Sequence, residues 1–142
     1  MIVVRRVTDI RDLDAAFTIR EKVFVEEQKV PQDAEYDQHD KTANHYLATY
    51  NEIPVGAARW RPTTNGIKLE RFAVLPAYRN KQVGSALLHE VLKDVLANFP
   101  DEKIYLHAQV PALSFYARHG FTKLGELFTE CDIDHFKMVY SA

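Results

Sequence analysis

A basic turn near the middle of the chain combines residue types that suit a bound anion. Arg79 and Lys81 carry positive charge, and Gly84 lets a ligand come close to the backbone. The turn leads into a segment with helical periodicity, whose first amides lack partners inside the helix and favour negative charge. Phosphate suits such a helix start best. Polar turns also join strands to helices without binding a ligand, so the turn alone leaves both interpretations open.

A strand before the turn and a helix after it would hold these groups in place. Residues 67–74 are apolar and β-favouring around Glu70 and Arg71, and Pro76 ends the strand because it has no amide hydrogen to donate. After the turn, apolar residues recur at steps of three and four, which predicts a helix from near Gln82 to about residue 98 with one buried face. We therefore expect a strand–turn–helix unit around the basic turn.

The remaining segments predict an α/β (α+β) fold with a mixed, mostly antiparallel sheet of six to seven strands and about four helices. Residues 104–108 should run parallel to residues 67–74, because a helix connects the two segments. Residues 26–40 are acidic and should be a loop with a short helical turn. The expected strands are residues 2–7, 45–50, 55–61, 67–74, 104–108, 121–128 and 135–140, and the expected helices follow Asp9, Gln82 and Pro111.

Length and charge exclude several classes of protein. The 142 residues fit one domain over residues 1–142. A net charge of -2 with scattered Lys and Arg argues against nucleic acid as a partner. A single cysteine excludes an internal disulfide, and no signal peptide or long apolar run is visible, so we expect a cytoplasmic protein without a membrane partner.

Metal and cysteine chemistry find little support in the sequence. The six histidines show no pair at helical ligand spacing with a carboxylate, and Cys131 has no second cysteine to share a zinc ion. Glu130 and Asp132 flank Cys131 and oppose formation of a thiolate. We therefore expect no metal. A P-loop is remote as well, because the turn lacks the Gly-Lys-Ser/Thr ending.

Two runs of sequence resemble motifs of the GNAT superfamily of N-acetyltransferases. Residues 72–88, FAVLPAYRNKQVGSALL, resemble its central acetyl-CoA motif, whose pattern is Arg or Gln, two residues, Gly, one residue, Gly or Ala. Residues 109–121, QVPALSFYARHGF, are similar to its second motif, in which Asn usually stands in place of Gln109. A third group of residues is similar to the ElaA-like and YjcF-like branch of small bacterial GNAT proteins: Arg20, residues 23–28, Pro31, Gly125, Glu126 and His135.

The resemblance implies a single-domain GNAT fold whose sheet is splayed in the middle. Two parallel strands would separate after Val74 and Ala108, and the backbone of Phe72 and Val74 would pair with the pantetheine arm of acetyl-CoA. Gln109 would bond a pantetheine amide. The implied donor-binding residues are Phe72, Ala73, Val74, Arg79, Asn80, Lys81, Gln82, Val83, Gly84, Ser85 and Gln109.

One residue departs from the motif. Gln82 stands where the first motif glycine is expected. A positive φ there would cost glutamine about 1–2 kcal/mol, whereas helical geometry costs almost nothing. We therefore predict a helical Gln82, with the amides of residues 83–85 still facing the pyrophosphate.

The implied reaction is transfer of acetyl from acetyl-CoA to a primary amine of a small-molecule or peptidyl acceptor, by direct attack in a ternary complex. A Lys-like amine with a pKa near ~10.4 is neutral in only about one molecule in a thousand at neutral pH, so a base is useful. Glu70 is the first candidate, and pairing with nearby cations is its other possible role. The backbone amide of Val74 would stabilise the oxyanion.

Tyr116 would hydrogen-bond the leaving thiolate, and without the motif around it we would assign it to core packing. Glu26, Glu27 and His135 are the reserve bases and the expected acceptor-side residues. The acidic segment, residues 26–40, would overhang the acceptor site and attract a cationic amine. The alternative function is a non-catalytic acyl-CoA binding or sensing module, which needs neither Glu70 nor Tyr116. A monomer and a homodimer both remain open, because an exposed edge strand can pair with a second copy.

Overall fold

Seven strands form one mixed sheet in the computed structural model, which describes residues 1–141. Their order in the sheet is β1-β2-β3-β4-β5-β7-β6, and the pair β4–β5 is parallel while the other pairs are antiparallel. This confirms the predicted fold class. The strands are β1 (Ile2–Arg6), β2 (Asn44–Tyr50), β3 (Ile53–Thr63), β4 (Gly66–Val74), β5 (Ile104–Gln109), β6 (Phe121–Glu130) and β7 (Ile133–Tyr140).

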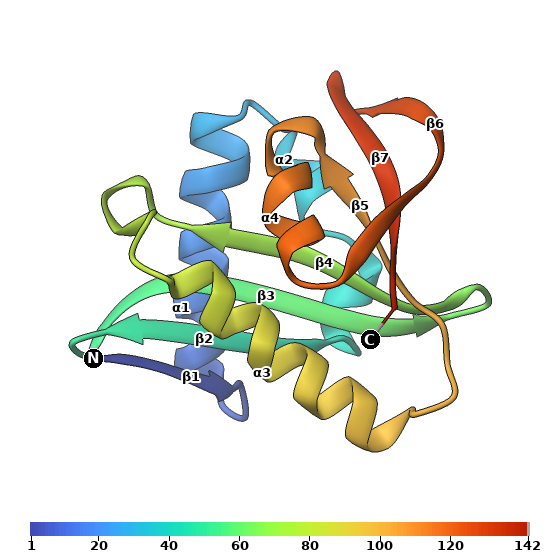
Figure 1. Ribbon diagram of the computed structural model, residues 1–142. Helices are drawn as coiled ribbons and strands as arrows, with labels where there is room; N and C mark the ends of the chain where they lie inside the picture. The colour runs from blue at the N-terminus through green and yellow to red at the C-terminus, as the bar shows by residue number, and fades with distance from the viewer. Residues whose placement is uncertain (142) are drawn as a thin grey trace.

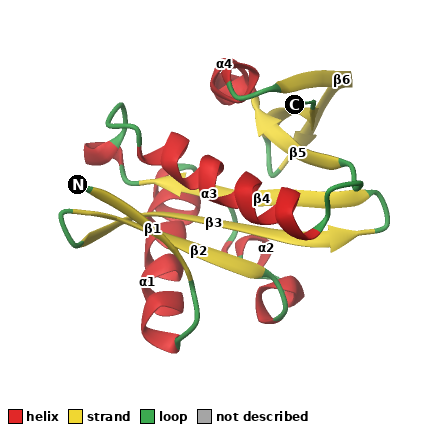
Figure 2. Cartoon of the chain, turned by 60° about the horizontal axis from the view of Figure 1, so that its bottom comes forward, coloured by secondary structure: helices red, strands yellow, loops and turns green. Residues whose placement is uncertain are grey.

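Helices cover both faces of the first four strands. Figure 2 shows α1 on one face and α3 on the other, and each packs over its own apolar cluster, around Ile19 for α1 and around Leu87 for α3. Asp9 caps α1 by accepting a hydrogen bond from the Asp12 amide at 2.8 Å. The helices are α1 (Ile10–Arg20), the π-helix η1 (Glu21–Glu27), α2 (Gln32–Glu35), α3 (Val83–Asn98) and α4 (Leu113–Arg118), with 3₁₀ turns η2 (Gln38–Lys41), η3 (Pro76–Tyr78) and η4 (Val110–Ala112).

A β-bulge interrupts β4 beside β3. Ala57 pairs with Ala73 while Arg59 pairs with Glu70, so Arg71 and Phe72 together oppose Ala58. Arg71 has a φ of 58°, the left-handed conformation that a bulge can impose. An ordinary strand would place residues 70 and 72 on the same face. Here Phe72 packs with the cluster under α3, whereas Glu70 lies among ion pairs on the opposite face.

The parallel pair separates early. β4 and β5 pair over Ile67–Leu69 and Ile104–Leu106 and then diverge. Figure 1 shows β5, β7 and β6 leaning away from the first four strands. We expected the separation only after Val74 and Ala108, and it begins some residues sooner because the bulge bends β4 just past the last paired residue. No helix of residues 1–141 is long and apolar enough to cross a membrane.

Candidate functional site

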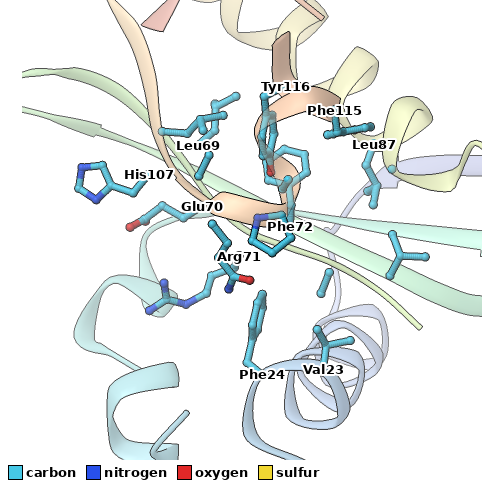
Figure 3. A pocket seen from close by; sticks show the side chains of 18 of the residues that line it. Val23, Phe24, Leu69, Glu70, Arg71, Phe72, Leu87, His107, Phe115 and Tyr116 are labelled. Carbon is cyan, nitrogen blue, oxygen red and sulfur yellow. The ribbon is translucent and has the colours of Figure 1, made fainter. Parts of the chain in front are cut away.

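A cavity of about 790 Å³ opens where β4 and β5 diverge. Its walls come mainly from β4, β5, β7, η1, α2, the end of β6 and the N-terminal parts of α3 and α4. Figure 3 shows Leu87 and Phe115 at one side of the cavity and His107 and Glu70 at the other. The cavity therefore has two ends: a helix-start end at α3 and a strand end near Glu70.

The helix-start end presents free backbone amides. The first hydrogen bond of α3 runs from the Ala86 amide to the Gln82 carbonyl at 3.0 Å, so the amides of residues 83–85 have no partner in the helix. A Cβ on Gly84 would lie 3.4 Å from the Phe115 ring, in van der Waals contact with it, so a larger side chain there would extend into the space beside this ring. The predicted donor-binding residues all line the cavity except Lys81, whose Nζ lies 5.9 Å from the Tyr50 ring centroid.

Gln82 is not helical, so that prediction was wrong. Its φ of 70° and ψ of 12° are left-handed, and α3 begins one residue later, at Val83. Asn80 also has a positive φ, because the chain reverses direction between η3 and α3. The packing of both elements outweighs the local preference of glutamine, and the turn keeps the backbone shape that a glycine would adopt.

Arg79 already has an acidic partner at the edge of this end. Its guanidinium donates two hydrogen bonds to Glu27, at 2.8 and 2.7 Å, and its Nε donates to the Val74 carbonyl at 2.9 Å. The bond from Arg79 lowers the pKa of Glu27. Glu26 and Glu27 are absent from the cavity wall, contrary to their expected place beside the acceptor. η1 carries Glu27 toward the basic turn instead.

The free edge of β4 faces the cavity. The Leu75 amide donates to the Val55 carbonyl at 2.9 Å, so Leu75 faces β3. Backbone groups alternate along a strand, and the N–H and C=O groups of Phe72 and Val74 therefore point away from β3, toward the gap left by β5. The Val74 carbonyl accepts from Arg79 Nε, and the other groups are available to a ligand that lies in the gap like an added strand.

Tyr116 lies in the wall of the gap with its side chain close to Phe72. The two ring centroids are 6.3 Å apart and nearly perpendicular, and Figure 3 shows the two side chains together. Tyr116 is 9% exposed, and within residues 1–141 its hydroxyl has no hydrogen-bond partner. Burial raises the pKa of Tyr116 well above that of an ordinary phenol, so it remains a hydrogen-bond donor at neutral pH.

Gln109 reaches across the cavity to η1. Its Nε2 donates to Oε1 of Gln28 at 2.8 Å, and both residues line the cavity. The sequence alone gives no sign of this role for Gln28. The contact joins the residue that follows η1 to the end of β5, 81 positions further along the sequence.

Glu70 is surrounded by cations. Its Oε1 accepts hydrogen bonds from Arg59 Nε at 3.0 Å and Arg61 Nε at 2.7 Å, and Lys68 Nζ lies 3.2 Å from its Oε2. Burial alone would raise the pKa of Glu70, but the bond from Arg61 and the charges of Arg59 and Lys68 lower it to about 2. A carboxylate held in this way is a weak proton acceptor at neutral pH.

Arginines neutralise most of the acidic segment. Asp37 and Asp40 both bind the fully buried Arg59, and Glu35 and Asp40 bind the equally buried Arg20. We expected these carboxylates to attract a cationic acceptor, and this expectation was wrong. Their partners lie on α1 and β3, far away in sequence, so the segment looks more acidic in sequence than it is in space.

A second charged group lies at the strand end of the cavity. His135 Nε2 is 3.8 Å from Glu130 Oε1, and His107 Nδ1 is 3.4 Å from Glu130 Oε2. All three residues line the cavity. The sequence pointed to His135 alone, because only the pairing of β5, β7 and β6 brings the other two beside it. Among residues 1–141, no three His, Cys, Asp or Glu side chains are arranged to hold a metal ion.

Known proteins resemble this chain over nearly its whole length. The model of the acetyltransferase (GNAT) domain matches residues 8–142. The chain is 38% identical to the uncharacterized N-acetyltransferase YjcF of Bacillus subtilis, over 89% of this chain and 91% of YjcF. It is similar to the crystal structure of Escherichia coli ElaA, with a TM-score of 0.90, 28% identity and coverage of 99% of this chain and 100% of ElaA.

A third similarity concerns the fold alone. A GNAT family acetyltransferase from Elizabethkingia anophelis, crystallised with acetyl-CoA bound, superposes with a TM-score of 0.70 at 18% identity. The superposition covers 97% of this chain and 94% of that chain.

Proposed function

The chain belongs to the GNAT acetyltransferase family, and from this premise we propose that it transfers acetyl from acetyl-CoA to a primary amine of a small-molecule or peptidyl acceptor. The family and the predicted enzyme class, an acyltransferase, are thereby confirmed. The attack on the thioester would be direct, within a ternary complex of protein, donor and acceptor.

The gap between β4 and β5, which ends at free helix amides, is the observation that carries the proposal. A pyrophosphate against residues 83–85 would meet three N–H groups and the positive end of the 16-residue helix α3. From there the pantetheine arm can follow the free edge of β4 at Phe72 and Val74 toward Gln109. A GNAT protein of the same fold has been crystallised with acetyl-CoA bound, which supports this use of the cavity.

The residues around the gap suit the transfer step. The amide of Val74 can stabilise the oxyanion that forms on the thioester carbonyl. Tyr116 would hydrogen-bond the leaving thiolate. Full proton transfer from a phenol with a pKa of ~10 to a thiolate with a conjugate pKa of ~8.5 is uphill by about 2 kcal/mol. Burial raises the pKa of Tyr116 further, so hydrogen bonding is the role that fits.

A non-catalytic acyl-CoA sensor is the second candidate, and the position of Glu70 favours it. Three cations hold this carboxylate and lower its pKa to about 2, so the central strand lacks the base that we expected there. A sensor would bind acetyl-CoA and release no coenzyme A. An enzyme needs its proton acceptor somewhere else in the cavity.

A thiol-release assay with acetyl-CoA and a panel of amines separates the two candidates. For an enzyme, Tyr116→Phe should lower kcat by about 10²-fold and leave the Kd for coenzyme A unchanged in calorimetry. Tyr50→Phe is the matched control, because this ring packs on Tyr78 at the far end of β2. Binding of acetyl-CoA without release of thiol for any amine would favour the sensor. Absence of binding would contradict both functions.

A further inference from the structure

A carboxylate and two imidazoles meet at the strand end of the cavity, and neighbouring strands hold them there. Glu130 ends β6, His135 lies on β7 and His107 lies on β5. In the register of the sheet, His135 is opposite Gln109 on one side and Phe128 on the other. His135 therefore adjoins Gln109, where the proposed donor site ends, and Glu130 lies between His135 and His107.

The hydrogen bonds of His135 fix which of its nitrogens is free. Nδ1 lies 2.7 Å from the carbonyl oxygen of Ile133, and a carbonyl can only accept, so Nδ1 carries the proton. In the neutral ring Nε2 then keeps its lone pair. This atom lies 3.8 Å from Oε1 of Glu130, which is also an acceptor. In this neutral form, two acceptors face each other with no proton between them.

Glu130 differs from the other carboxylates of the cavity wall. Glu35 pairs with Arg20 and Arg71, and Glu70 is held by three cations. Within residues 1–141, the partners of Glu130 inside 4.0 Å are imidazoles alone. Its side chain is 47% exposed, and a ligand can reach it.

The neighbours of Glu130 keep the carboxylate ionised but do not fill its capacity to accept hydrogen bonds. His107 lowers the pKa of Glu130, with smaller contributions from Lys68 and His135, and these outweigh burial. Lys68 itself is bound to Glu70 at 3.2 Å. Nδ1 of His107 is buried and lies 3.4 Å from Oε2 of Glu130, but it makes no well-aligned hydrogen bond in the described part of the chain. The cluster therefore lacks a cation that can donate several hydrogen bonds, which is the chemistry of a primary ammonium group.

We propose that Glu130, His107 and His135 bind the ammonium group of the acceptor and that Nε2 of His135 accepts its proton. This inference rests on the proposed acetyltransferase function. An ammonium nitrogen between Oε1 and Nε2 can lie ~2.8 Å from both atoms, given their separation. Val23, Phe24 and Val30 line the same cavity, so the acceptor is a primary ammonium on an apolar body.

The reaction then balances without a further reagent. The acceptor R–NH₃⁺ gives one proton to Nε2 of His135, and the free amine attacks the thioester carbon. As the C–N bond forms, the carbonyl electron pair moves to oxygen, and it returns when the C–S bond breaks and sulfur leaves with its electron pair. The nitrogen loses its second proton and the thiolate gains one. The products are the acetamide, coenzyme A and the proton held by His135, which passes to solvent.

Two kinds of nucleophile test the assignment in the intact protein. Phenethylamine, tryptamine and cadaverine are cationic at neutral pH, whereas hydroxylamine is mostly neutral and needs neither an anionic partner nor a base. Glu130→Gln should raise KM for the cationic amines about tenfold, and His135→Asn should lower kcat for them about 10²-fold. Asparagine keeps an N–H for the Ile133 carbonyl but removes Nε2. Both variants should acetylate hydroxylamine within about threefold of the wild-type rate, and added imidazole should restore part of the His135→Asn activity.

Calorimetry provides a readout besides turnover. Phenethylamine should bind the protein–coenzyme A complex about tenfold more weakly in Glu130→Gln, and Glu126→Gln, an exposed carboxylate on the same strand, should bind it like wild type. Equal losses for both nucleophiles, or hydroxylamine as the sole acceptor, would overturn the ammonium site while leaving the acetyltransferase intact. An imidazolium form of His135 paired with Glu130, seen by NMR at neutral pH, would overturn it as well. Absence of acetyl-CoA binding would reject the proposed function itself.

Discussion

The two ends of the cavity recognise ligands by different means. At α3 the groups that face the cavity are main-chain amides of residues 83–85 and the free edge of β4, which almost any sequence can supply. At the strand end they are side chains, and many of them belong to an ion-pair network around Arg59 and Glu70.

This difference predicts which substitutions each end of the cavity tolerates. Backbone recognition depends on the shape of one turn and on the absence of a side chain at Gly84, so single substitutions elsewhere in the turn should have small effects. Side-chain recognition depends on charges that balance one another inside the protein. Removal of one buried charge leaves its partners unsatisfied, and we expect stability to fall along with function.

Loss of Arg59 should have the largest effect of the changes considered, and it should act on the stability of the strand end. Its side chain is fully buried and contacts Asp37, Asp40 and Glu70, with distances of 2.7 to 3.0 Å. Arg59→Met should lower the free energy of unfolding by about 3–5 kcal/mol, because three carboxylates lose a partner. Urea unfolding followed by fluorescence of Trp60, the single tryptophan, measures the change. Arg61→Met, whose side chain is 21% exposed, should cost less, and equal costs would contradict a network centred on Arg59.

The second-largest effect should come from acid, which weakens the ion pairs of Glu70 at the strand end. Because the folded pKa of Glu70 is about 2, below the ordinary 4.5, its contribution is full above the ordinary value and is lost as pH falls toward 2. The contribution is roughly 3 kcal/mol. The difference in unfolding free energy between wild type and Glu70→Gln should shrink by this amount between about pH 5 and about pH 2. A constant difference would show that Glu70 is not held by its cations.

A side chain at Gly84 should affect the other end alone. Gly84→Val places its first carbon 3.4 Å from the Phe115 ring and adds two methyl groups at a position that lines the cavity. We expect the Kd for acetyl-CoA to rise about 30-fold, equivalent to about 2 kcal/mol, with a small change in stability. Ala86→Val, two residues further along α3 and absent from the cavity wall, is the control. If both variants bind alike, the helix start does not hold the donor.

The smallest effect should come from Gln82. Gln82→Gly removes the strain of a φ of 70°, partly offset by the greater freedom of glycine in the unfolded chain, and should stabilise the protein by about 0.5–1 kcal/mol. Gln82→Ala keeps the strain and should not stabilise. The affinity for acetyl-CoA should be unchanged in both variants, since the amides of residues 83–85 do not move. A large loss of affinity in either variant would contradict recognition by the backbone alone and would show that the glutamine side chain contributes to binding.

Local patterns predicted the helix-start end well. The apolar spacing from Val83 onward gave the span of α3, and Pro76 and Gly120 marked the ends of elements, because these signals depend on near neighbours in sequence. Gln82 was the exception. Its left-handed conformation belongs to the turn that joins η3 to α3, and the helical preference of glutamine gives no sign of it.

The strand end was harder to predict because its partners are distant in sequence. Asp37 and Arg59 are 22 positions apart, so the acidic segment gave no sign of its own neutralisation. Glu130 meets His107 only through the order in which β5, β7 and β6 pair. Sequence reasoning identified His135 through the resemblance and missed Glu130, since a carboxylate before a hairpin turn usually faces solvent.

The extra residue in β4 has one more consequence. Beyond the bulge, each side chain of β4 faces the opposite side of the sheet from the one it would face in a regular strand. Glu70 and Phe72 therefore point to opposite faces although they are only two residues apart. Deletion of Arg71 would shorten the segment yet preserve that arrangement, whereas one more insertion after it would invert everything downstream and turn Val74 away from the gap. The protein should therefore tolerate a shortening of this segment better than a lengthening by the same single residue.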